Sequence, residues 1–507
     1  MESRQQVRER PTVPTLDERR ARGATARTGT PRRSHAGWEP TAGRRSPVDL
    51  LAEQNTNREP DLVPVRHGRM MVSPFTFYRG AARVMAEDLK DTPTAGLTVQ
   101  VCGDAHLSNF GVFGSPERRL VFDLNDFDET LPGPFEYDVK RMAASFVVAA
   151  RDNGFTPAEA RAAAEASVTA YREAMAGFAQ QGTMDIWYAS LDEDKIKAAV
   201  RDAGKAVRDT GKTAAKSTAA KSTATKTTGT KSEADGDRAR MVKLAEKRVG
   251  LAAAKAHARD SLQALSKLGE LEGGRYRIVN QPPVVIPLRD LAPELTPDHL
   301  SQLIREQFAA YRASLQPDMR HLLGHFEVVD VARKVVGVGS VGTRCFIVLL
   351  QGRDASDPLF LQVKEATGSV LEEHLPRSRY RQHGQRVVQG QRLMQATSDI
   401  YLGWARGVDV NRHFYWRQLR DMKGSVVIEE MTPLGLTLYA QLCGWTMARA
   451  HARSGDPVAI AAYLGNGTAF DRSITDFAER YADQNARDHE EFLTAIKSGK
   501  LTAVEGV

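Results

Sequence analysis

The chain has 507 residues, 41% hydrophobic and 26% charged, which is the composition of a globular protein with room for two or more domains. Its net charge of +7 comes in good part from the tails and a linker, so basicity alone does not indicate nucleic-acid binding. The odd number of cysteines, all in apolar runs, favours buried free thiols in a reducing compartment. No stretch of about 18 apolar residues and no apolar signal region occur, so we expect a cytoplasmic protein without a membrane span.

Local patterns predict helices in the first part of the chain. Residues 1–45 are rich in Arg, Thr, Pro and Gly without apolar periodicity, and are predicted to be a disordered tail. Ser73 followed by Pro74 is typical of a helix N-cap with proline in the first turn, and predicts a helix to about Leu89. The apolar stripe of 135–152 and the alanines of 157–180 predict two longer helices.

The composition changes abruptly at residues 204–236, which consist almost wholly of Lys, Ala, Thr, Ser and Gly and cannot form a core. We interpret this segment as a flexible insertion, after which 238–269 resumes as a charged helix. The predicted parts are a disordered tail, a helical segment that includes Leu97–Asp128, the insertion, a helical connection, a Gly-rich β-strand segment, and C-terminal helices. Their boundaries are 1–45, 46–203, 204–237, 238–325, 326–433 and 434–507.

The stretch Leu97–Asp128 concentrates more oxygen ligands than any other segment. Two short runs rich in Val, Leu and Phe, 98–102 and 120–124, predict a hairpin-like pair of strands with the polar residues on loops. Carboxylate and amide oxygens gathered in this way suit Mg²⁺, which needs only one or two protein carboxylates. A surface loop of Asx-capped turns is the alternative. The polar residues are Asp104, His106, Asn109, Asp123, Asn125, Asp126 and Asp128.

A second informative region combines strands, glycines and a lysine. Gly337, Gly339 and Gly342 form a G-x-G-x-x-G sequence, but a dinucleotide fingerprint requires a helix directly afterwards. Residues 345–350 continue as a strand instead, and the next strand ends in Lys364. A Gly-rich hairpin over phosphates with a lysine on the following strand is the arrangement of protein-kinase-like enzymes. An ordinary hairpin with a solvated lysine is the alternative.

The acidic stretch has the spacing of the kinase catalytic pattern, in which an Asp is followed five positions later by an Asn and then by Asp-Phe-Gly. Asp104 and Asn109 differ by five positions, and Asp126-Phe127-Asp128 follows. In that chemistry the first Asp accepts the proton of the attacking hydroxyl, whereas the Asn and the second Asp hold the metal ions. Asp104 is therefore the candidate base, Asn109 and Asp126 are candidate metal ligands, and Asp128 is an additional one.

The segment Gly103-Asp-Ala-His-Leu-Ser-Asn109 resembles the HGDxHxxN loop of aminoglycoside and choline phosphotransferase-like kinases. That resemblance implies a loop-orienting role for His106 and a structural role for Asp138, which would bond loop backbone from a helix N-terminus. The region from about Ser46 to Ala452 also resembles a bacterial family, the domain of unknown function 2252, and this implies a kinase-like fold. The blocks that carry this resemblance are HGRMMVSPFTFYRGAA, CGDAHLSNFG, FDLNDFDETLPGPFEYDVKR, GVGSVGTR, GQRLMQATSDIYLGW and FYWRQLRDMKGS.

The order of these motifs is inverted relative to an ordinary kinase. The Gly-rich turn and Lys364 follow Asp104 by more than 200 positions, whereas in a kinase they precede the catalytic loop. Domains tolerate such rewiring when the relevant chain ends lie close together at the surface. We therefore predict an α+β, kinase-like two-lobed fold that is circularly permuted, with the catalytic-lobe motifs before the Gly-rich β lobe.

The predicted helix over 384–397 departs from the kinase pattern. Gln389 lies where we expect the Glu that pairs with the lysine, and a neutral amide offers a hydrogen bond but no charge. Either Glu372 or Glu373 substitutes for it, or Lys364 is held less firmly.

Residues 413–421 are predicted to form the last strand and the interlobe hinge. Backbone around Gln418 and Leu419 would there meet the edge of an adenine. A plain strand with solvated arginines is the alternative.

The sequence thus predicts a phosphotransferase that binds ATP and Mg²⁺ and acts on a hydroxyl acceptor whose identity the sequence does not reveal. A non-catalytic nucleotide-binding regulator, favoured by Gln389, and a metal-dependent phosphohydrolase using Asp123, Asp126 and Asp128 are the alternatives. Adenylyl rather than phosphoryl transfer also stays open. The site residues are Asp104, His106 and Lys364 for catalysis; Gly337, Gly339, Ser340, Gly342, Lys364, Gln418 and Leu419 for the nucleotide; and Asn109, Asp126 and Asp128 for the metal.

Overall fold

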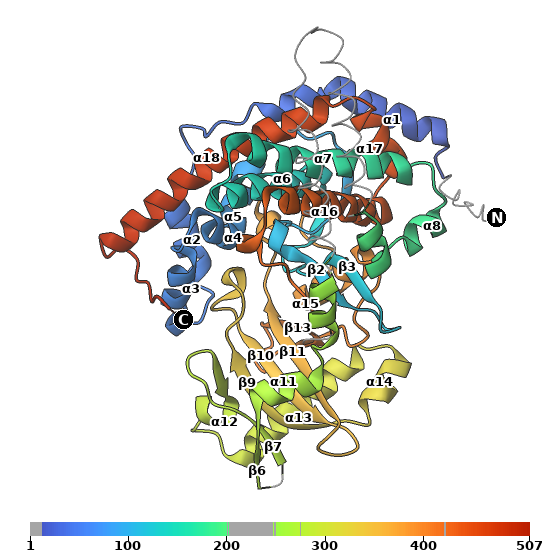
Figure 1. Ribbon diagram of the computed structural model, residues 1–507. Helices are drawn as coiled ribbons and strands as arrows, with labels where there is room; N and C mark the ends of the chain where they lie inside the picture. Colours follow the sequence, from blue (N-terminus) through green and yellow to red (C-terminus); the bar gives the residue numbers. More distant parts are fainter. Residues whose placement is uncertain are drawn as a thin grey trace, which may run out of the picture.

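The structure is a computed structural model that describes residues 13–199, 201, 247, 250–273, 275–419 and 422–506. A helical part lies above a sheet-containing part in Figure 1, so the predicted α+β class is confirmed. The predicted flexible insertion lies outside the described residues, as does most of the helix predicted to follow it. Among the described residues, no helix is both long and apolar enough to cross a membrane.

The helical part is built around α6 (Phe135–Asp152), which is buried along nearly its whole length, as its apolar stripe predicts. α7 (Pro157–Phe178) begins at the capping box of Thr156 and packs between α6 and α16 (Pro433–Ser454). α18 (Ala469–Lys497) lies across α6 and α7 (Figure 1). The smaller helices of this part are α2 (Pro47–Asn55), η2 (Pro60–Leu62), α3 (Val63–Met70), α8 (Thr183–Tyr188) and η6 (Ile428–Glu430).

The predicted disordered tail is wrong for residues 13–45. α1 (Leu16–Gly29) packs against α17 (Pro457–Leu464), and Gly23 allows the close approach because a Cβ there would clash with the Ala459 carbonyl. η1 (Arg32–Ala36) packs on α18. A helix cap, a glycine contact and buried ion pairs therefore order a segment without apolar periodicity. The buried ion pairs are those of Arg44 with Asp88 and Asp488.

The single helix predicted to run to Leu89 is two helices in the structure. α4 (Pro74–Gly80) starts at the predicted Ser73 cap, and α5 (Ala82–Leu89) follows after a non-helical Ala81. The guanidinium of Arg66 donates a hydrogen bond of 2.9 Å to the Gly80 carbonyl. That carbonyl thus has a side-chain partner at the helix end, as helix termini require.

The two strands of the acidic stretch exist, but they do not pair with each other. β1 (Thr98–Val101) pairs with β4 (Leu131–Pro134), and β3 (Leu120–Leu124) pairs with β2 (Phe110–Gly114). The predicted hairpin between β1 and β3 is therefore wrong. The pairing that forms instead places the loops after β1 and after β3 side by side, because the Asn125 N–H donates to the Asn109 carbonyl at 2.8 Å. The short elements η3 (Leu107–Asn109) and β5 (Leu191–Asp192) complete this region.

The sheet-containing part has six antiparallel strands in the order β12-β13-β11-β10-β9-β8. The Gly-rich segment connects the neighbours β9 and β10, and Lys364 lies on β11 opposite Cys345, so the predicted unit of three strands is confirmed. The strands are β8 (Val285–Pro287), β9 (Glu327–Lys334), β10 (Cys345–Gln351), β11 (Pro358–Ala366), β12 (Gly403–Arg406) and β13 (His413–Gln418).

Helices cover both faces of this sheet. Side chains of α13 (Pro297–Ala313) and α14 (Pro317–Leu323) pack on one face, and those of α11 (Ser261–Leu268) pack on the other. α15 (His383–Met394) follows β11 in the chain, as predicted, and packs on β11, β12, β13 and α16. α15 thereby links the sheet to the helical part. The remaining elements are β6 (Gly269–Glu272), β7 (Arg275–Ile278), α12 (Leu288–Leu291), η4 (Val338–Ser340) and η5 (Val370–Glu373).

The three cysteines are buried and unpaired, as the sequence predicts: Cys102, Cys345 and Cys443.

Candidate active site

The loop after β1 is hydrogen-bonded to Asp138 of α6. The Asp138 carboxylate accepts hydrogen bonds from the N–H groups of Cys102 at 2.6 Å and Gly103 at 2.9 Å, which confirms its predicted structural role. Gly103 has a φ of +84°, and a Cβ there would clash with the Glu129 carbonyl. A glycine at this position therefore lets the loop turn tightly against the loop that contains Asp126, Phe127 and Asp128, called the Asp-Phe-Asp loop below.

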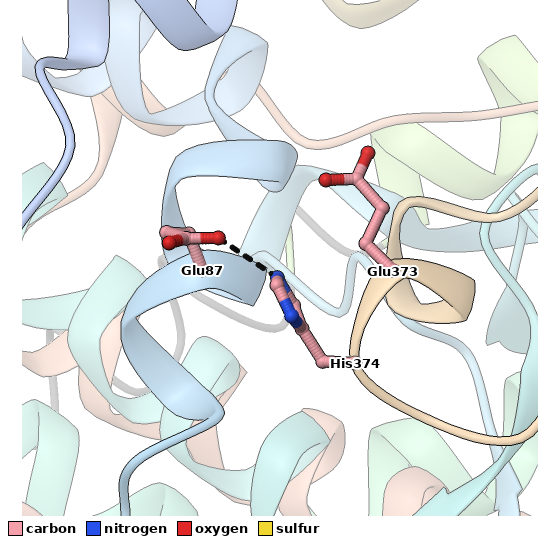
Figure 2. Close-up of side chains that lie close together, drawn as sticks. All are labelled: Glu87, Glu373 and His374. Carbon is pink, nitrogen blue, oxygen red and sulfur yellow. Dashed lines mark ion pairs between the residues drawn. The ribbon is translucent and has the colours of Figure 1, made fainter.

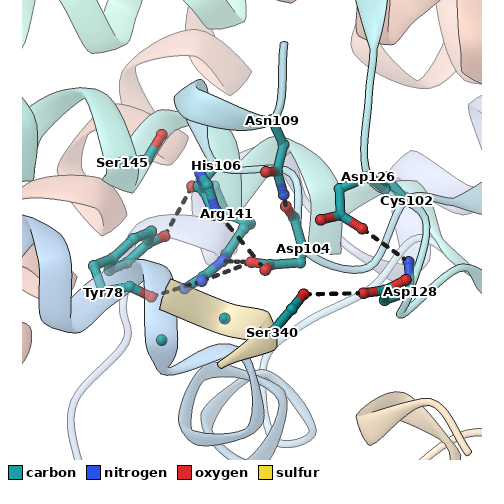
Figure 3. Close-up of polar contacts among 12 residues, drawn as sticks. Tyr78, Cys102, Asp104, His106, Asn109, Asp126, Asp128, Arg141, Ser145 and Ser340 are labelled. Atoms are coloured by element: carbon teal, nitrogen blue, oxygen red, sulfur yellow. Dashed lines mark hydrogen bonds and ion pairs between the residues drawn. The ribbon is translucent and has the colours of Figure 1, made fainter. Parts of the chain in front are cut away.

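Asp104 follows this turn and lies against Arg141 of α6 (Figure 3). The Nε and Nη2 groups of Arg141 contact Oδ1 of Asp104 at 2.9 and 2.7 Å. Oδ2 faces His106, whose Nε2 lies 3.9 Å away. Burial raises the pKa of Asp104 although Arg141 opposes the shift, and burial together with Arg141 lowers the pKa of His106 well below its usual value. Asp104 thus presents one oxygen beside a neutral imidazole.

Asn109 has a fixed side-chain orientation. Its Nδ2 donates a hydrogen bond of 2.6 Å to the Asp104 carbonyl (Figure 3), so Oδ1 is left as the acceptor end of the amide. Because the backbone of Asn109 also accepts from Asn125, the amide stays next to the Asp-Phe-Asp loop.

Asp126 is the more open acid of that loop, with 34% of its side chain exposed. Its Oδ1 accepts a hydrogen bond of 3.3 Å from the Asp128 N–H, and its Oδ2 lies 3.8 Å from Lys364 Nζ. Burial and the negative charge of Asp128 raise the pKa of Asp126. The ion pair of Asp126 with Lys364 is therefore longer than that of Asp128, and the carboxylate keeps an accessible part that a divalent ion could use.

Asp128, in contrast, is bonded through both oxygens. Oδ2 lies 2.6 Å from Lys364 Nζ and accepts from the Ser340 hydroxyl at 3.3 Å, while Oδ1 accepts from the Tyr415 hydroxyl at 2.7 Å. Burial opposes ionisation of Asp128, but Lys364 and Tyr415 outweigh it and lower the pKa of Asp128. Burial likewise disfavours the charge of Lys364, yet Asp126 and Asp128 raise the pKa of Lys364 well above its usual value. The pair is charged, and Asp128 is the acidic partner of the lysine.

The predicted substitutes for an acid on α15 lie elsewhere. Glu372 accepts from the Ser378 N–H at 3.4 Å, and Glu373 pairs with Arg83 at 2.9 Å. The prediction that either of them pairs with Lys364 is therefore wrong. Within the described chain, no hydrogen bond joins Gln389 to Lys364.

The contact of α15 with the Asp-Phe-Asp loop runs through an arginine instead of an acid. Arg386 donates hydrogen bonds to the carbonyls of Asp128 and Thr130, both at 2.7 Å, and of Thr367 at 2.9 Å. Because these acceptors are backbone groups, Arg386 fixes the path of the loop and leaves the carboxylates free for other partners.

Figure 2 shows a second group of ionisable side chains, where η5 approaches α5. His374 Nε2 lies 2.9 Å from Glu87 Oε2, and Glu373 lies beside this pair. The three side chains lie close enough together to hold a metal ion. Each carboxylate has a cationic partner already, since Glu87 pairs with Lys90 at 2.6 Å and Glu373 with Arg83. We interpret the group as an ion-pair network between the two parts of the molecule.

The Gly-rich segment approaches the Asp-Phe-Asp loop through Ser340 (Figure 3). Arg58 holds it by donating to the carbonyls of Gly339, at 2.9 Å, and of Val341. Gly342 has a φ of +85°, and a Cβ there would lie 3.1 Å from the Arg58 stem. Gly337 has no atom that a Cβ would meet within 4 Å. The backbone and the space around it therefore require glycine at position 342 but not at position 337. The contact of the Gly-rich segment with nucleotide phosphates stays a prediction.

The hinge residues have their N–H groups engaged. The Gln418 N–H donates to the Asp399 carboxylate, and the Leu419 N–H donates to the Phe360 carbonyl at 2.9 Å. These two N–H groups are therefore not free to meet an adenine edge, and the contact of the hinge backbone with adenine stays a prediction.

Asp123 differs from the other acids of the stretch because it is fully buried. It forms an ion pair with Arg449 and accepts hydrogen bonds from the N–H groups of Leu124 at 2.9 Å and Ala396 at 2.8 Å. A carboxylate with these partners cannot ligate a metal ion without breaking them. The structure therefore speaks against Asp123 as the ligand that the phosphohydrolase alternative assigns to it.

Sequence reasoning missed several cations of the site. Arg417 donates to Gln362 Oε1 at 2.9 Å and to the Asn125 carbonyl at 3.1 Å. Burial, with repulsion from Arg417, lowers the pKa of Lys423 to about 7. Strand alternation was a usable signal for Arg417, because it places this residue on the same face as Tyr415. Arg141 lies one helical turn after Asp138, which was a usable signal, whereas Arg58 had no signal in the sequence that linked it to these loops.

These contacts define a protein of mixed helices and sheet in which acids of the helical part meet a lysine of the sheet. The chain matches the family model described as an uncharacterized protein conserved in bacteria, DUF2252, over residues 58–248 and 242–495, and it belongs to that family. No curated protein and no solved structure matches the chain.

Proposed function

We propose that this protein is an ATP- and Mg²⁺-dependent phosphotransferase of kinase-like type, with its motifs in permuted order, acting on a hydroxyl acceptor. The contact of Lys364 with Asp128 carries the proposal, because it joins the strand after the Gly-rich segment to the Asp-Phe-Asp loop. In kinases a Gly-rich loop, a lysine on the third strand, a helix and an aspartate of this kind act together on the phosphates. β9, β10, β11 and α15 supply the same succession.

Asp104 would accept the proton of the acceptor hydroxyl. Its raised pKa supports this role, because a carboxylate with a higher pKa is the stronger proton acceptor. Arg141 occupies Oδ1, so Oδ2 is the oxygen for the hydroxyl. His106, neutral beside Oδ2, would orient that oxygen without competing for the proton.

The donor set suits Mg²⁺, since Asp126 offers an accessible carboxylate whose ion pair with Lys364 is long, and Asn109 offers the oxygen of a fixed amide. Bound Mg²⁺ would neutralise charge on the phosphates. Asp128 would hold Lys364 in place, and Lys364 would anchor the phosphates of the nucleotide.

A non-catalytic nucleotide-binding regulator is the second candidate. The observation that favours it is that both carboxylate oxygens of Asp128 are already bonded, to Lys364, Tyr415 and Ser340. Of the predicted metal ligands, Asp126 and Asn109 then remain for a metal ion. Turnover therefore has to be measured separately from binding.

The test measures ATP binding with and without Mg²⁺, and then release of the γ-phosphate, for the unmodified protein and for Asp104→Asn and Asp126→Asn. We expect Asp104→Asn to bind ATP normally and to lose about 10²- to 10⁴-fold in turnover, because only the proton acceptor is removed. Asp126→Asn should lose the Mg²⁺ dependence of binding. Asp483→Asn, an exposed acid of α18, is the matched control.

Tight ATP binding without turnover in the unmodified protein would favour the regulator. Failure of the unmodified protein to bind ATP, ADP or any other nucleotide, with or without Mg²⁺, would overturn both candidates.

A further inference from the structure

Arg417 of β13 lies on the face of the sheet that meets the Asp-Phe-Asp loop. On that face Lys364 of β11 is opposite Tyr415 of β13, and both side chains bond Asp128. Arg417 follows Tyr415 by two positions, so its side chain leaves the strand on the same face. Its Nη1 donates a hydrogen bond of 3.1 Å to the carbonyl of Asn125, the residue directly before the loop. Strand register and a hydrogen bond therefore place Arg417 beside the candidate phosphate anchor, and the proposed function assigns it no role.

Both acceptors that Arg417 contacts are neutral. Besides the Asn125 carbonyl, Oε1 of Gln362 accepts a hydrogen bond of 2.9 Å from Nε. Among the described residues Arg417 forms no ion pair, and its Nη2 has no acceptor although protein does not enclose that atom. Burial opposes the charge of Arg417, but Tyr415 and Asp126 outweigh it and raise the pKa of Arg417. A charged guanidinium with open N–H groups and without a carboxylate partner is suited to an oxyanion.

The guanidinium of Arg417 is held in one orientation. Gln362 is opposite Arg417 in the register of β11 and β13. Nε2 of Gln362 contacts Sγ of Cys345 at 3.4 Å, so Oε1 is the end of the amide that turns to Arg417. Because one contact is to a strand residue and the other is to the backbone at the Asp-Phe-Asp loop, the guanidinium is positioned before any ligand binds.

Arg417 lies on the hinge side of Lys364. Lys364 is opposite the first residue of β10, which follows the Gly-rich segment, whereas Gln362 is two residues further from that segment. The predicted hinge residues Gln418 and Leu419 follow Arg417 directly. With the terminal phosphates at the Gly-rich segment and the base at the hinge, as the sequence predicts, Arg417 lies where the phosphate nearest the nucleoside would lie.

We propose that Arg417 binds the phosphate nearest the nucleoside, next to the phosphates that Lys364 anchors. This rests on the proposed function for the identity of the anion as a nucleotide. The guanidinium would donate its open N–H groups to the phosphate oxygens, while Nε and Nη1 keep their bonds to Gln362 and Asn125.

The test is titration calorimetry of adenosine, AMP, ADP and ATP with the full-length protein in Mg²⁺, for the unmodified protein, Arg417→Gln and Arg417→Lys. A charge-assisted hydrogen bond is worth roughly tenfold to a hundredfold in affinity. We expect Arg417→Gln to weaken AMP, ADP and ATP by this factor, because all three carry the phosphate nearest the nucleoside, and to leave adenosine unchanged. Arg417→Lys should recover part of the loss, because it keeps the positive charge.

Arg412→Gln is the matched control. Arg412 directly precedes β13 and pairs with Glu365 at 2.8 Å. Glu365 is next to Lys364 on β11, so its side chain leaves the strand on the opposite face. The control removes an arginine at the same sheet without touching the face that meets the Asp-Phe-Asp loop, and it should leave all four affinities unchanged.

Adenosine separates phosphate binding from a purely structural role. If Arg417 only tied β13 to the Asp-Phe-Asp loop, its loss would distort the site and weaken adenosine as much as the nucleotides. Equal losses for all four ligands in Arg417→Gln, a loss confined to ATP, or no loss at all would each overturn the proposal.

Inorganic pyrophosphate separates this proposal from the proposed function. Pyrophosphate binding that weakens in Arg417→Gln, in a protein that binds no nucleotide, would refute the proposed function and leave Arg417 as an oxyanion-binding residue. Nucleotide binding and turnover that are both unaltered in Arg417→Gln would refute the role of Arg417 and leave the proposed function intact.

Discussion

Lys364 and Asp128 form an ion pair of 2.6 Å although 236 positions of sequence separate them. The lysine side chain is 3% exposed, so its charge depends on this partner and on Asp126. The pair joins β11 of the sheet to the loop of Asp126-Phe127-Asp128 in the helical part.

Lys364→Met should lower the free energy of unfolding by about 3 kcal/mol, because it leaves Asp128 and Asp126 partly buried without their cation. Asp128→Asn in the Lys364→Met background should recover part of this loss, since the second change removes one of the unpaired charges. Urea unfolding of the two single variants and the double variant measures the coupling. Additive losses would show that the two residues do not stabilise each other.

Changes at Gln389 should have little effect on nucleotide affinity, because Asp128 already supplies the negative charge next to Lys364. For both Gln389→Ala and Gln389→Glu we expect affinity for ATP within about twofold of the unmodified protein. Fluorescence titration with an ATP analogue is the measurement. A large gain of affinity in Gln389→Glu would instead mean that the lysine lacks a partner in solution.

Asp123→Asn should destabilise the protein by about 3 to 5 kcal/mol, since it leaves the buried Arg449 without its carboxylate. The double change with Arg449→Met should be less harmful and should retain Mg²⁺-dependent nucleotide binding. Calorimetric unfolding and metal titration of the double variant check both points. Loss of metal affinity in a well-folded double variant would revive the phosphohydrolase alternative.

Glu129 should make stability depend on pH. Burial raises the pKa of Glu129 from 4.5 to about 7, while the Val370 N–H, which donates to it at 2.7 Å, acts against the rise. The folded protein therefore binds more protons than the unfolded chain between these values, and stability falls as pH rises from about 4.5 to 7. Glu129→Gln keeps an acceptor for Val370 and should remove this part of the dependence. Urea midpoints of both proteins at pH 5 and pH 7 provide the comparison; parallel profiles would contradict the shift.

Local features were predictable wherever the determining residues are neighbours in sequence. The cap at Ser73, the buried stripe of α6, and the succession of strand, glycines, strand and Lys364 all follow from patterns within one continuous segment of the chain. The role of Asp138 was predictable as well, because a motif spacing placed it under the loop of Asp104.

The failures involve partners that lie far apart in the chain. The strand at 98–102 was expected to pair with 120–124, but β4 takes its place. Residues 13–45 were expected to be disordered, but α17 and α18 supply the surface on which they pack. Hydrophobic periodicity carries no information about which distant element provides a surface or a backbone partner.

The sequence by itself determined which groups the chain offers: Asp104, an amide and two further acids on one stretch, and a lysine behind a Gly-rich turn on another. Only the tertiary structure decided how they are paired, with Asp128 bonded closely to Lys364 and Asp126 left as the more exposed acid. The physical reason is that residue type and spacing set which groups can ionise or bond. Which of them meet depends on how α15 and the sheet pack against the helical part.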